Sequence, residues 1–270
     1  DTITTGADTD VILGDNGAVT YTPGTTFVAS ATSTDTVNAT GGDDVIDAGE
    51  GDNLVMAGVG ADTVTAGTGN DLVMGDNGEF NWDATGLLTD FASTDPALGA
   101  DDVIDVGDGT NIVVGGFGND TITTGAGADI VLGDDGQVDY VGADGDSTDI
   151  DSIVSTSTTA FGGTDTIVTG GGDDIVIGGR MDDTIDAGDG DNLVIGDSGQ
   201  ITADTVDAPQ MAGQPITLGL VESIQIDDGG SDTITTGTGA DIVLAGFGGD
   251  QLTTGTGDDI VFGDNGLVDY

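Results

Sequence analysis

The sequence contains no cysteine, no histidine and a single basic residue, Arg180, against 51 acidic residues. Without cysteine and histidine the chain cannot form disulfides, zinc-finger ligand sets or the nucleophile–imidazole pairs of Ser-His and Cys-His enzymes. The shortage of Lys and Arg argues against binding to nucleic acid or to anionic membrane surfaces, because both attract positive charge. No run of residues is long and apolar enough to span a membrane.

Few aromatic residues and a net charge of -50 on 270 residues would normally indicate disorder. However, 36% of the residues are hydrophobic, which favours a folded protein. An acidic surface without counter-charge destabilises a compact state by self-repulsion, so the missing positive charge must come from outside. Carboxylate and carbonyl oxygens are hard ligands, and they suit Ca²⁺.

A period of nine residues organises most of the chain. From Thr40 the sequence reads TGGDDVIDA, GEGDNLVMA, GVGADTVTA and GTGNDLVMG, which fits the frame G-x-G-x-[DN]-x-U-x-x with U aliphatic. After four nonads comes an Asp-Asn-Gly or similar triplet and then an insert without the pattern. The sequence predicts one elongated repeat domain, 1–270, with units at approximately 1–39 (partial), 40–97, 98–160, 161–227 and 228–270 (partial).

These nonads strongly resemble the calcium-binding nonapeptide repeats of the repeats-in-toxin, or hemolysin-type, family, whose motif is G-G-x-G-x-D-x-U-x. The resemblance implies an all-β fold, a calcium-binding parallel β-roll or β-solenoid with two nonads per coil. It also implies several Ca²⁺ ions between turns stacked on the same side. The motif match places the metal ligands at Asp1, Asp10, Asp44, Asn53, Asp62, Asp71, Asp102, Asn111, Asp120, Asp129, Asp165, Asp174, Asp183, Asn192, Asp232, Asp241, Asp250 and Asp259.

Nonads two apart should share a side of the roll, so that Asp44 pairs with Asp62 and Asn53 with Asp71. Because Asn has an amide oxygen but no charge, Asn sites should be weaker or differently coordinated. Acidic residues just before the ligand position, such as Asp43, are expected to be solvated. The alternative to a calcium roll is a metal-free solenoid with solvated Asp side chains. Three residues replace the second glycine of the frame and make their sites poorer: Asp8, Ala100 and Met181.

Strand alternation directs each U residue into the core and its two neighbours outward. In odd-numbered nonads these neighbours are mostly polar, as at Thr63 and Thr65. In even-numbered nonads all of them are apolar, as at Leu72 and Met74, which is typical of a parallel sheet buried on both faces. A bare stripe of this length exceeds what a soluble monomer exposes. We therefore expect a cover, either the inserts folded back as strand pairs or a neighbouring chain.

The inserts carry apolar residues for such a cover, including Phe80, Phe91 and Val206, and their stretches VTYT, EFNW and QVDY alternate as strands do. The triplet DNG at the start of an insert predicts a tight turn with positive φ. Five acidic residues open the inserts, and each either forms this turn or closes the last calcium turn: Asp15, Asp76, Asp134, Asp197 and Asp264.

The sequence favours a structural role, as a calcium-stabilised segment of a secreted, repetitive bacterial filament, matrix protein or adhesin stalk, extracellular or at the cell surface. A repeat array extends unless it is capped, and the chain opens and closes in mid-repeat. Self-association is therefore expected end to end, with the apolar even sheet or the inserts as lateral surfaces.

Two other functions stay open. The resemblance implies export by type I secretion, so the chain could instead be the calcium-dependent secretion and folding module of a secreted enzyme or toxin. Its Thr-x-Thr triplets also suggest an ice- or surface-binding β-solenoid, although Thr simply favours exposed strands. No enzymatic activity is expected, because paired acids occur throughout the chain and mark no particular catalytic site.

Overall fold

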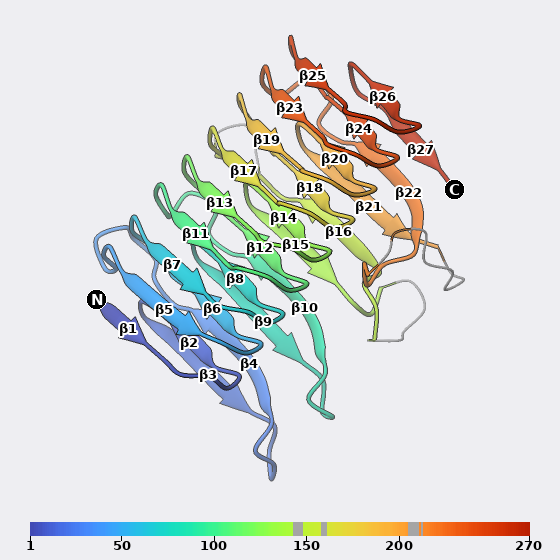
Figure 1. Ribbon diagram of the computed structural model, residues 1–270. Coiled ribbons are helices and arrows are strands. Elements are labelled where there is room, and N and C mark those ends of the chain that lie inside the picture. Colours follow the sequence, from blue (N-terminus) through green and yellow to red (C-terminus); the bar gives the residue numbers. More distant parts are fainter. Residues whose placement is uncertain (143–147, 158–160, 205–210, 212) are drawn as a thin grey trace.

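Three layers of β-sheet, each of nine strands, make up the computed structural model (Figure 1). The structure describes residues 1–142, 148–157, 161–204, 211 and 213–270. The insert residue Val206 lies outside the described residues. Nowhere in these ranges is there a helix that could cross a membrane.

The first layer, which we call the Thr-rich sheet, is built from the odd-numbered nonads and is parallel throughout. Its strands, in spatial order, are β1 (Thr2–Thr4), β5 (Val45–Gly49), β7 (Thr63–Ala66), β11 (Val103–Asp105), β13 (Thr121–Thr123), β17 (Thr166–Val168), β19 (Thr184–Asp186), β23 (Thr233–Thr235) and β25 (Gln251–Thr253). The outward-facing residues Thr63 and Val103 are exposed, as the sequence predicts for this face.

The second layer, the middle sheet, is built from the even-numbered nonads and is also parallel. Its strands are β2 (Val11–Leu13), β6 (Leu54–Met56), β8 (Leu72–Met74), β12 (Ile112–Val114), β14 (Ile130–Leu132), β18 (Ile175–Ile177), β20 (Leu193–Ile195), β24 (Ile242–Leu244) and β26 (Ile260–Phe262).

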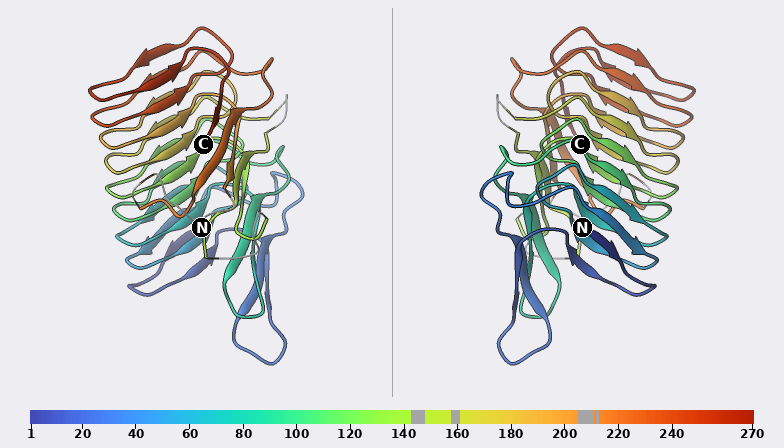
Figure 2. Two further views of the ribbon diagram at one scale, coloured as in Figure 1. Left: turned by 90° about the vertical axis from the view of Figure 1, so that its right-hand side faces the viewer. Right: turned by 90° about the vertical axis from the view of Figure 1, so that its left-hand side faces the viewer.

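The third layer, the hairpin sheet, is antiparallel and is built from the inserts. Its strands, in chain order, are β3 (Gly17–Tyr21), β4 (Val28–Ser33), β9 (Gly78–Trp82), β10 (Leu88–Ser93), β15 (Gly136–Asp139), β16 (Ser152–Ser155), β21 (Gly199–Ala203), β22 (Leu218–Ser223) and β27 (Leu267–Asp269). Figure 2 shows the coils stacked on one side and the hairpins along the other, with the tips of the first two hairpins projecting beyond the coils.

The strand register confirms the prediction of two nonads per coil. Ile46 lies opposite Val64, which occupies the same place two nonads later. Val64 in turn lies opposite Ile104, although an insert separates them in the chain. The roll therefore resumes in the same register after an insert. The U residues, among them Ile46, Val64 and Val73, form a buried core between the Thr-rich and middle sheets.

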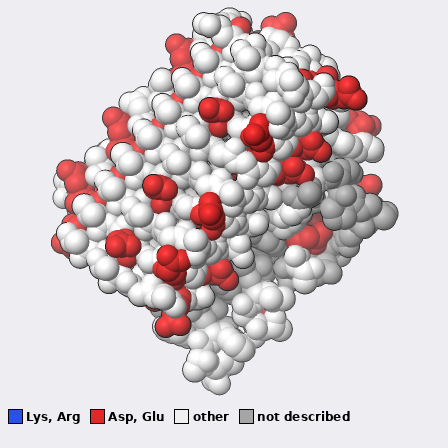
Figure 3. Space-filling model, in the orientation of Figure 1, with Lys and Arg blue, Asp and Glu red and all other residues white. Residues whose placement is uncertain are grey.

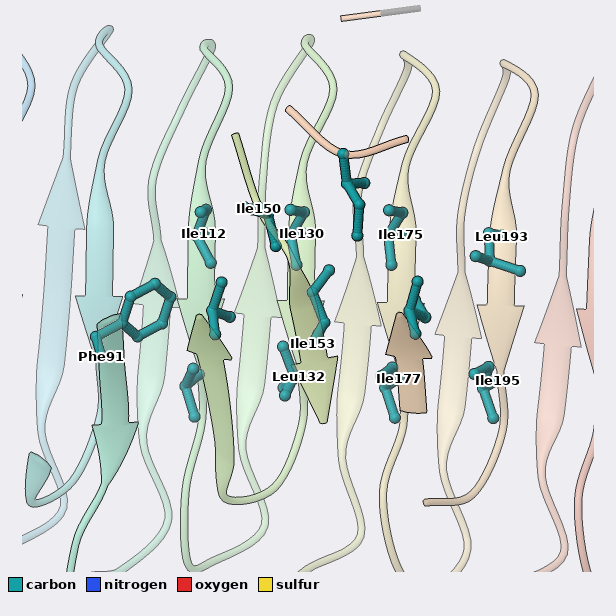
Figure 4. Close-up of a cluster of buried hydrophobic side chains, with 14 of the residues drawn as sticks. Phe91, Ile112, Ile130, Leu132, Ile150, Ile153, Ile175, Ile177, Leu193 and Ile195 are labelled. Carbon is teal, nitrogen blue, oxygen red and sulfur yellow. The ribbon is translucent and has the colours of Figure 1, made fainter. Parts of the chain in front are cut away.

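A second core fills the space between the middle and hairpin sheets (Figure 4). Ile130 and Leu132, which point outward from the roll, are buried here against Ile150 and Ile153 of the third insert. The predicted cover is thus confirmed, and it comes from the same chain. Burial on both faces explains why the middle strands are continuously apolar.

The hairpins also pair with one another, which the sequence does not reveal. Ala31 of β4 lies opposite Phe80 of β9, and Phe91 of β10 lies opposite Val138 of β15, both in antiparallel register. Because each hairpin edge is hydrogen-bonded to the next hairpin, the cover has no unpaired edge between successive inserts.

The prediction that the DNG triplets adopt positive φ is wrong. Neither Asp76, Asn77 nor Gly78 has positive φ. Gly78 is instead the first residue of β9, and a Cβ there would lie 2.4 Å from Cε of Met74 and 2.9 Å from the backbone oxygen of Ala92. Glycine is therefore required for space, because the chain doubles back over the end of the strand that it has just left.

Candidate metal centre

The predicted ligand positions lie in two columns of turns, one on each side of the roll. The closed edge contains the turns that lead from the Thr-rich sheet to the middle sheet. The insert edge contains the turns that lead back, and the inserts leave and return there. The closed edge carries Asp10, Asn53, Asp71, Asn111, Asp129, Asp174, Asn192, Asp241 and Asp259, and the insert edge carries Asp1, Asp44, Asp62, Asp102, Asp120, Asp165, Asp183, Asp232 and Asp250.

One oxygen of each inner carboxylate is fixed by a hydrogen bond along its column. The backbone N–H of Asp44 donates to Oδ1 of Asp62 (2.7 Å), and that of Asn53 donates to Oδ1 of Asp71 (2.8 Å). Both predicted pairs are therefore neighbours. The same bond recurs across an insert, where Asp62 N–H donates to Oδ1 of Asp102 (2.8 Å). These bonds orient the carboxylates identically from coil to coil.

In every insert-edge carboxylate except that of the exposed Asp1, the second oxygen is buried and has no hydrogen-bond partner. Such oxygens are costly, because burial removes water and nothing replaces it. The residues that share this feature are Asp44, Asp62, Asp102, Asp120, Asp165, Asp183, Asp232 and Asp250.

Backbone carbonyls share the space around these oxygens. A Cβ built on Gly75 would lie 2.3 Å from Oδ2 of Asp102 and 2.4 Å from the carbonyl oxygen of Gly115. A Cβ built on Gly133 would lie 2.4 Å from Oδ2 of Asp165 and 2.3 Å from the carbonyl oxygen of Gly178. No three acidic side chains among the described residues converge as a metal cluster. A site here must therefore combine carboxylate and carbonyl oxygens, and Ca²⁺ accepts six to eight such ligands.

Burial, with neighbouring carboxylates as a further cause, raises the pKa of six insert-edge residues: Asp62, Asp102, Asp120, Asp165, Asp183 and Asp232. Burial raises the pKa of Asp102 to about 9, with the charge of Asp120 as the next cause, and raises the pKa of Asp165 to about 8, with the charge of Asp134 as the next cause. Without a cation, these groups would be largely protonated at neutral pH. The residues present thus fit Ca²⁺, which would compensate the negative charge of the column and keep the carboxylates ionised.

The glycines of the turns adopt the conformation that the motif requires. Gly60 and Gly118 have φ of 143° and 142°. Met181 occupies the same position with φ of 71°, a conformation that costs a residue with a Cβ about 1–2 kcal/mol. Ala100 needs no such conformation, because the chain returns from an insert there and Gly99, with φ of 151°, precedes it. Asp8 likewise does not have positive φ.

The acidic residues that open the inserts bind backbone N–H groups of later insert-edge turns. Asp134 accepts hydrogen bonds from Gly163 N–H (2.8 Å) and Arg180 N–H (2.6 Å). Asp76 accepts from Phe117 N–H (2.6 Å), and Asp15 from Val59 N–H (2.9 Å) in the same way.

Asp197 accepts from Gly230 N–H (2.8 Å) and Phe247 N–H. Each of these carboxylates thus lies where the chain leaves the roll to form an insert, and it binds turns of the roll that come after that insert.

The exposed acidic residues next to the ligand positions form a second ladder that sequence reasoning missed. Asp52 Oδ1 accepts from Asn70 N–H (2.8 Å), and Asp191 Oδ1 accepts from Ala240 N–H (2.7 Å). Asp43 is exposed, as expected for a solvated residue, but it also accepts from Ala61 N–H (3.2 Å). Their recurrence at one position of the nonad was the available signal. Figure 3 shows acidic side chains across the face in view and no basic ones.

A family model described as the RTX calcium-binding nonapeptide repeat (4 copies) matches residues 1–21, 31–64, 48–79, 105–137, 169–200, 226–252 and 244–266. These ranges cover more than half of the chain. The chain belongs to the RTX calcium-binding nonapeptide repeat family. No curated protein is significantly similar to it. RTX repeats bind calcium and typically belong to secreted proteins, so the RTX chain is a calcium-binding structural module.

Proposed function

We propose that this RTX chain is a calcium-stabilised structural segment of a secreted, repetitive extracellular filament, matrix protein or adhesin stalk, and that it is not an enzyme. The observation that carries the proposal is the continuity of all three layers. The insert hairpins pair with one another as regularly as the coils do, so the cover repeats along the same axis as the roll.

A further unit added to this architecture would extend every layer in the same register. The pairing of Val64 with Ile104 shows that an insert does not interrupt the Thr-rich sheet. The pairing of Leu72 with Ile112 shows the same for the middle sheet. Such arrays are quasi-one-dimensional, because each unit contacts only its neighbours. The geometry favours a rod that grows by repetition of units near 40–97, 98–160 and 161–227.

Calcium would hold the turns of this rod together. Its ligands would come from the ligand-position residues of the two edges and from the carbonyl oxygens beside them. When bound, Ca²⁺ supplies the positive charge that a chain with a net charge of -50 lacks. The protein's own part is to fix one carboxylate oxygen per coil by a backbone hydrogen bond and to hold the other beside carbonyls.

The second candidate is a calcium-dependent secretion and folding module of a secreted enzyme or toxin, and family membership favours it. Both candidates share calcium-coupled folding, but they differ in assembly. In the first, the outer strands of the sheets associate with further copies, and exposed side chains such as Tyr21 (61%) and Phe27 (47%) offer lateral contacts. In the second, the module stays monomeric beside a separate functional domain.

The test uses the full natural chain purified with Ca²⁺. Addition of a chelator should weaken the β-sheet signal in circular dichroism and lower the melting temperature by a large margin, since metal binding and folding are coupled. Negative-stain electron microscopy with Ca²⁺ should show rods or fibres. Dichroism that is insensitive to chelation would refute calcium stabilisation, and compact monodisperse particles would refute the filament and favour the secretion module.

A further inference from the structure

The two edges of the roll carry different chemistry at the same motif position. Every ligand-position residue of the insert edge is Asp, whereas three residues of the closed edge are Asn. These three are Asn53, Asn111 and Asn192, and each lies between two Asp residues of its column. An amide group differs from a carboxylate in having N–H donors in place of its second oxygen.

The amide oxygen of each Asn takes over the role of the carboxylate Oδ1. Asp71 N–H donates to Oδ1 of Asn111 (3.0 Å), and Asp174 N–H donates to Oδ1 of Asn192 (3.0 Å). Asp10 N–H donates to Oδ1 of Asn53 in the same way (3.2 Å). The amide nitrogen therefore stands where an Asp has its second oxygen.

That nitrogen donates to carbonyl oxygens of the nonad's own glycines, in the same turn. Nδ2 of Asn53 donates to Gly51 O (2.8 Å), and Nδ2 of Asn111 donates to Gly107 O (3.2 Å). Nδ2 of Asn192 donates to both Gly188 O (3.3 Å) and Gly190 O (3.2 Å). A cation bound in these turns would need the same carbonyls and would meet N–H hydrogens instead of a carboxylate oxygen.

Hydroxyl groups supply further neutral donors on the closed edge. Thr236 Oγ1 donates to Oδ2 of Asp241 (2.6 Å), five residues later. Thr5, Thr124 and Thr169 occupy the same place in their turns, and their hydroxyls donate to the carbonyl oxygens of Ala48 (2.7 Å), Thr169 (3.0 Å) and Ala187 (3.2 Å), respectively. Ala48, Val106 and Ala187 precede the three Asn residues at this distance. The insert-edge turns that contain no insert have no hydroxyl five residues before the ligand position. The residues at that place are Ala57, Gly115, Gly178 and Ala245.

The fourth insert contributes another amide at the closed edge. Asp129 and Asp174 are neighbours in this column without an Asn between them. Gln214 reaches this place, and its Nε2 donates to the carbonyl oxygens of Asp129 (2.9 Å) and Asp173 (2.8 Å). Gln214, which lies outside the roll, thus supplies an amide donor to these carbonyls at a place where the column has no Asn.

We propose that the turns of Asn53, Asn111 and Asn192 bind no calcium, because their amide groups replace the ion, and that calcium binds chiefly along the insert edge. Eight carboxylates of the insert edge keep a buried oxygen without a partner, whereas only Asp71, Asp129 and Asp174 do so among the closed-edge ligand positions. The inference rests on the proposed calcium-binding function and assigns its sites to one side of the roll.

The experiment counts bound ions on the 270-residue chain by native mass spectrometry and equilibrium dialysis with Ca²⁺. The triple variant Asn53→Asp, Asn111→Asp, Asn192→Asp should bind more calcium than the unmodified chain, by about one ion per restored carboxylate. Without calcium it should unfold at a lower temperature, since each amide donor is lost and a buried charge is added. The matched insert-edge variant Asp62→Asn, Asp120→Asn, Asp183→Asn should bind fewer ions.

A crystal of the unmodified chain grown with Ca²⁺ provides a readout that does not depend on the folding of a variant. Anomalous difference density should appear along the insert edge and be absent from the three Asn turns. Equal density on both edges, or an unchanged ion count in the triple Asn→Asp variant, would overturn the inference while leaving calcium binding intact. If the unmodified chain binds no calcium at all, the proposed function itself fails.

Discussion

The guanidinium group of Arg180 donates two hydrogen bonds to the carboxylate of Asp228. This ion pair joins an insert-edge turn to the residue at which the sequence predicts the next unit to begin, after an insert. One unit earlier, Phe117 and Phe161 occupy the same two positions, and their ring centroids lie 6.2 Å apart. The same junction is therefore closed by an ion pair in one place and by an aromatic contact in another.

We expect Arg180→Ala to lower the free energy of unfolding by about 2 kcal/mol, because the Arg180 side chain is buried and Asp228 is left without its partner. The double variant Arg180→Phe, Asp228→Phe should recover most of this loss, as the Phe117–Phe161 pair demonstrates the fit. Denaturant unfolding in Ca²⁺ measures both. Equal stability of Arg180→Ala and the unmodified chain would show that the pair contributes nothing.

Two adjacent glycines of one closed-edge turn should respond differently to alanine. Gly172 has φ of 147°, and a Cβ there would lie 1.6 Å from the carbonyl oxygen of Gly127 in the neighbouring coil. Gly171 lacks positive φ, and its nearest contact would be Asp189 O at 3.6 Å. Thermal unfolding in Ca²⁺ should show a loss of about 3 kcal/mol for Gly172→Ala and less than about 0.5 kcal/mol for Gly171→Ala. Similar losses for both variants would contradict the stacking of turns described above.

Removal of an aromatic side chain from the hairpin sheet should destabilise the whole roll. Phe91 is 1% exposed and its ring centroid lies 5.9 Å from that of Phe80. Phe91→Ala should lower the free energy of unfolding by about 3–4 kcal/mol, because it leaves a cavity above the middle sheet. Phe27→Ala is the control and should lower it only slightly, since Phe27 is 47% exposed. The urea midpoint measures both, and a small effect of Phe91→Ala would mean that the cover contributes little to stability.

The stability of the calcium-free protein should fall as the pH rises. The pKa is raised in the folded chain to about 9 for Asp102 and to about 7 for Asp62 and Asp232, mainly through burial, against about 3.9 for an unfolded Asp. Between about pH 4 and about pH 9 the folded state therefore binds more protons than the unfolded state, and a rise in pH favours unfolding.

Calcium should reverse this dependence, because it binds the ionised carboxylates and competes with protons. Melting temperatures at about pH 5 and about pH 8 measure the effect, first after removal of calcium and then with excess Ca²⁺. The calcium-free melting temperature should be lower at the higher pH, and the increase produced by Ca²⁺ should be larger there. A calcium-free protein that is more stable at about pH 8 would show that the insert-edge carboxylates are not buried as described.

Much of the roll could be predicted from the sequence because its rules are local. A glycine turn followed by an alternating strand directs Ile46 inward and Thr63 outward from each residue's own neighbours in the chain. The repeat then places Asp44 beside Asp62 by translation alone. The demand for a cover followed from the outward pair Leu72 and Met74, whose apolar character has no local explanation.

The sequence by itself determined the period of the coil, the two ligand columns and the need for a second buried layer. Only the tertiary structure decided which groups meet across inserts: Ala31 with Phe80 in one continuous cover, Asp134 with Gly163 and Arg180 at an insert exit, and Gln214 with the carbonyl of Asp129. It also showed that Gly78 is needed for space and not for a positive φ. These contacts join residues that lie up to 85 positions apart, and the path of each insert through space sets their partners.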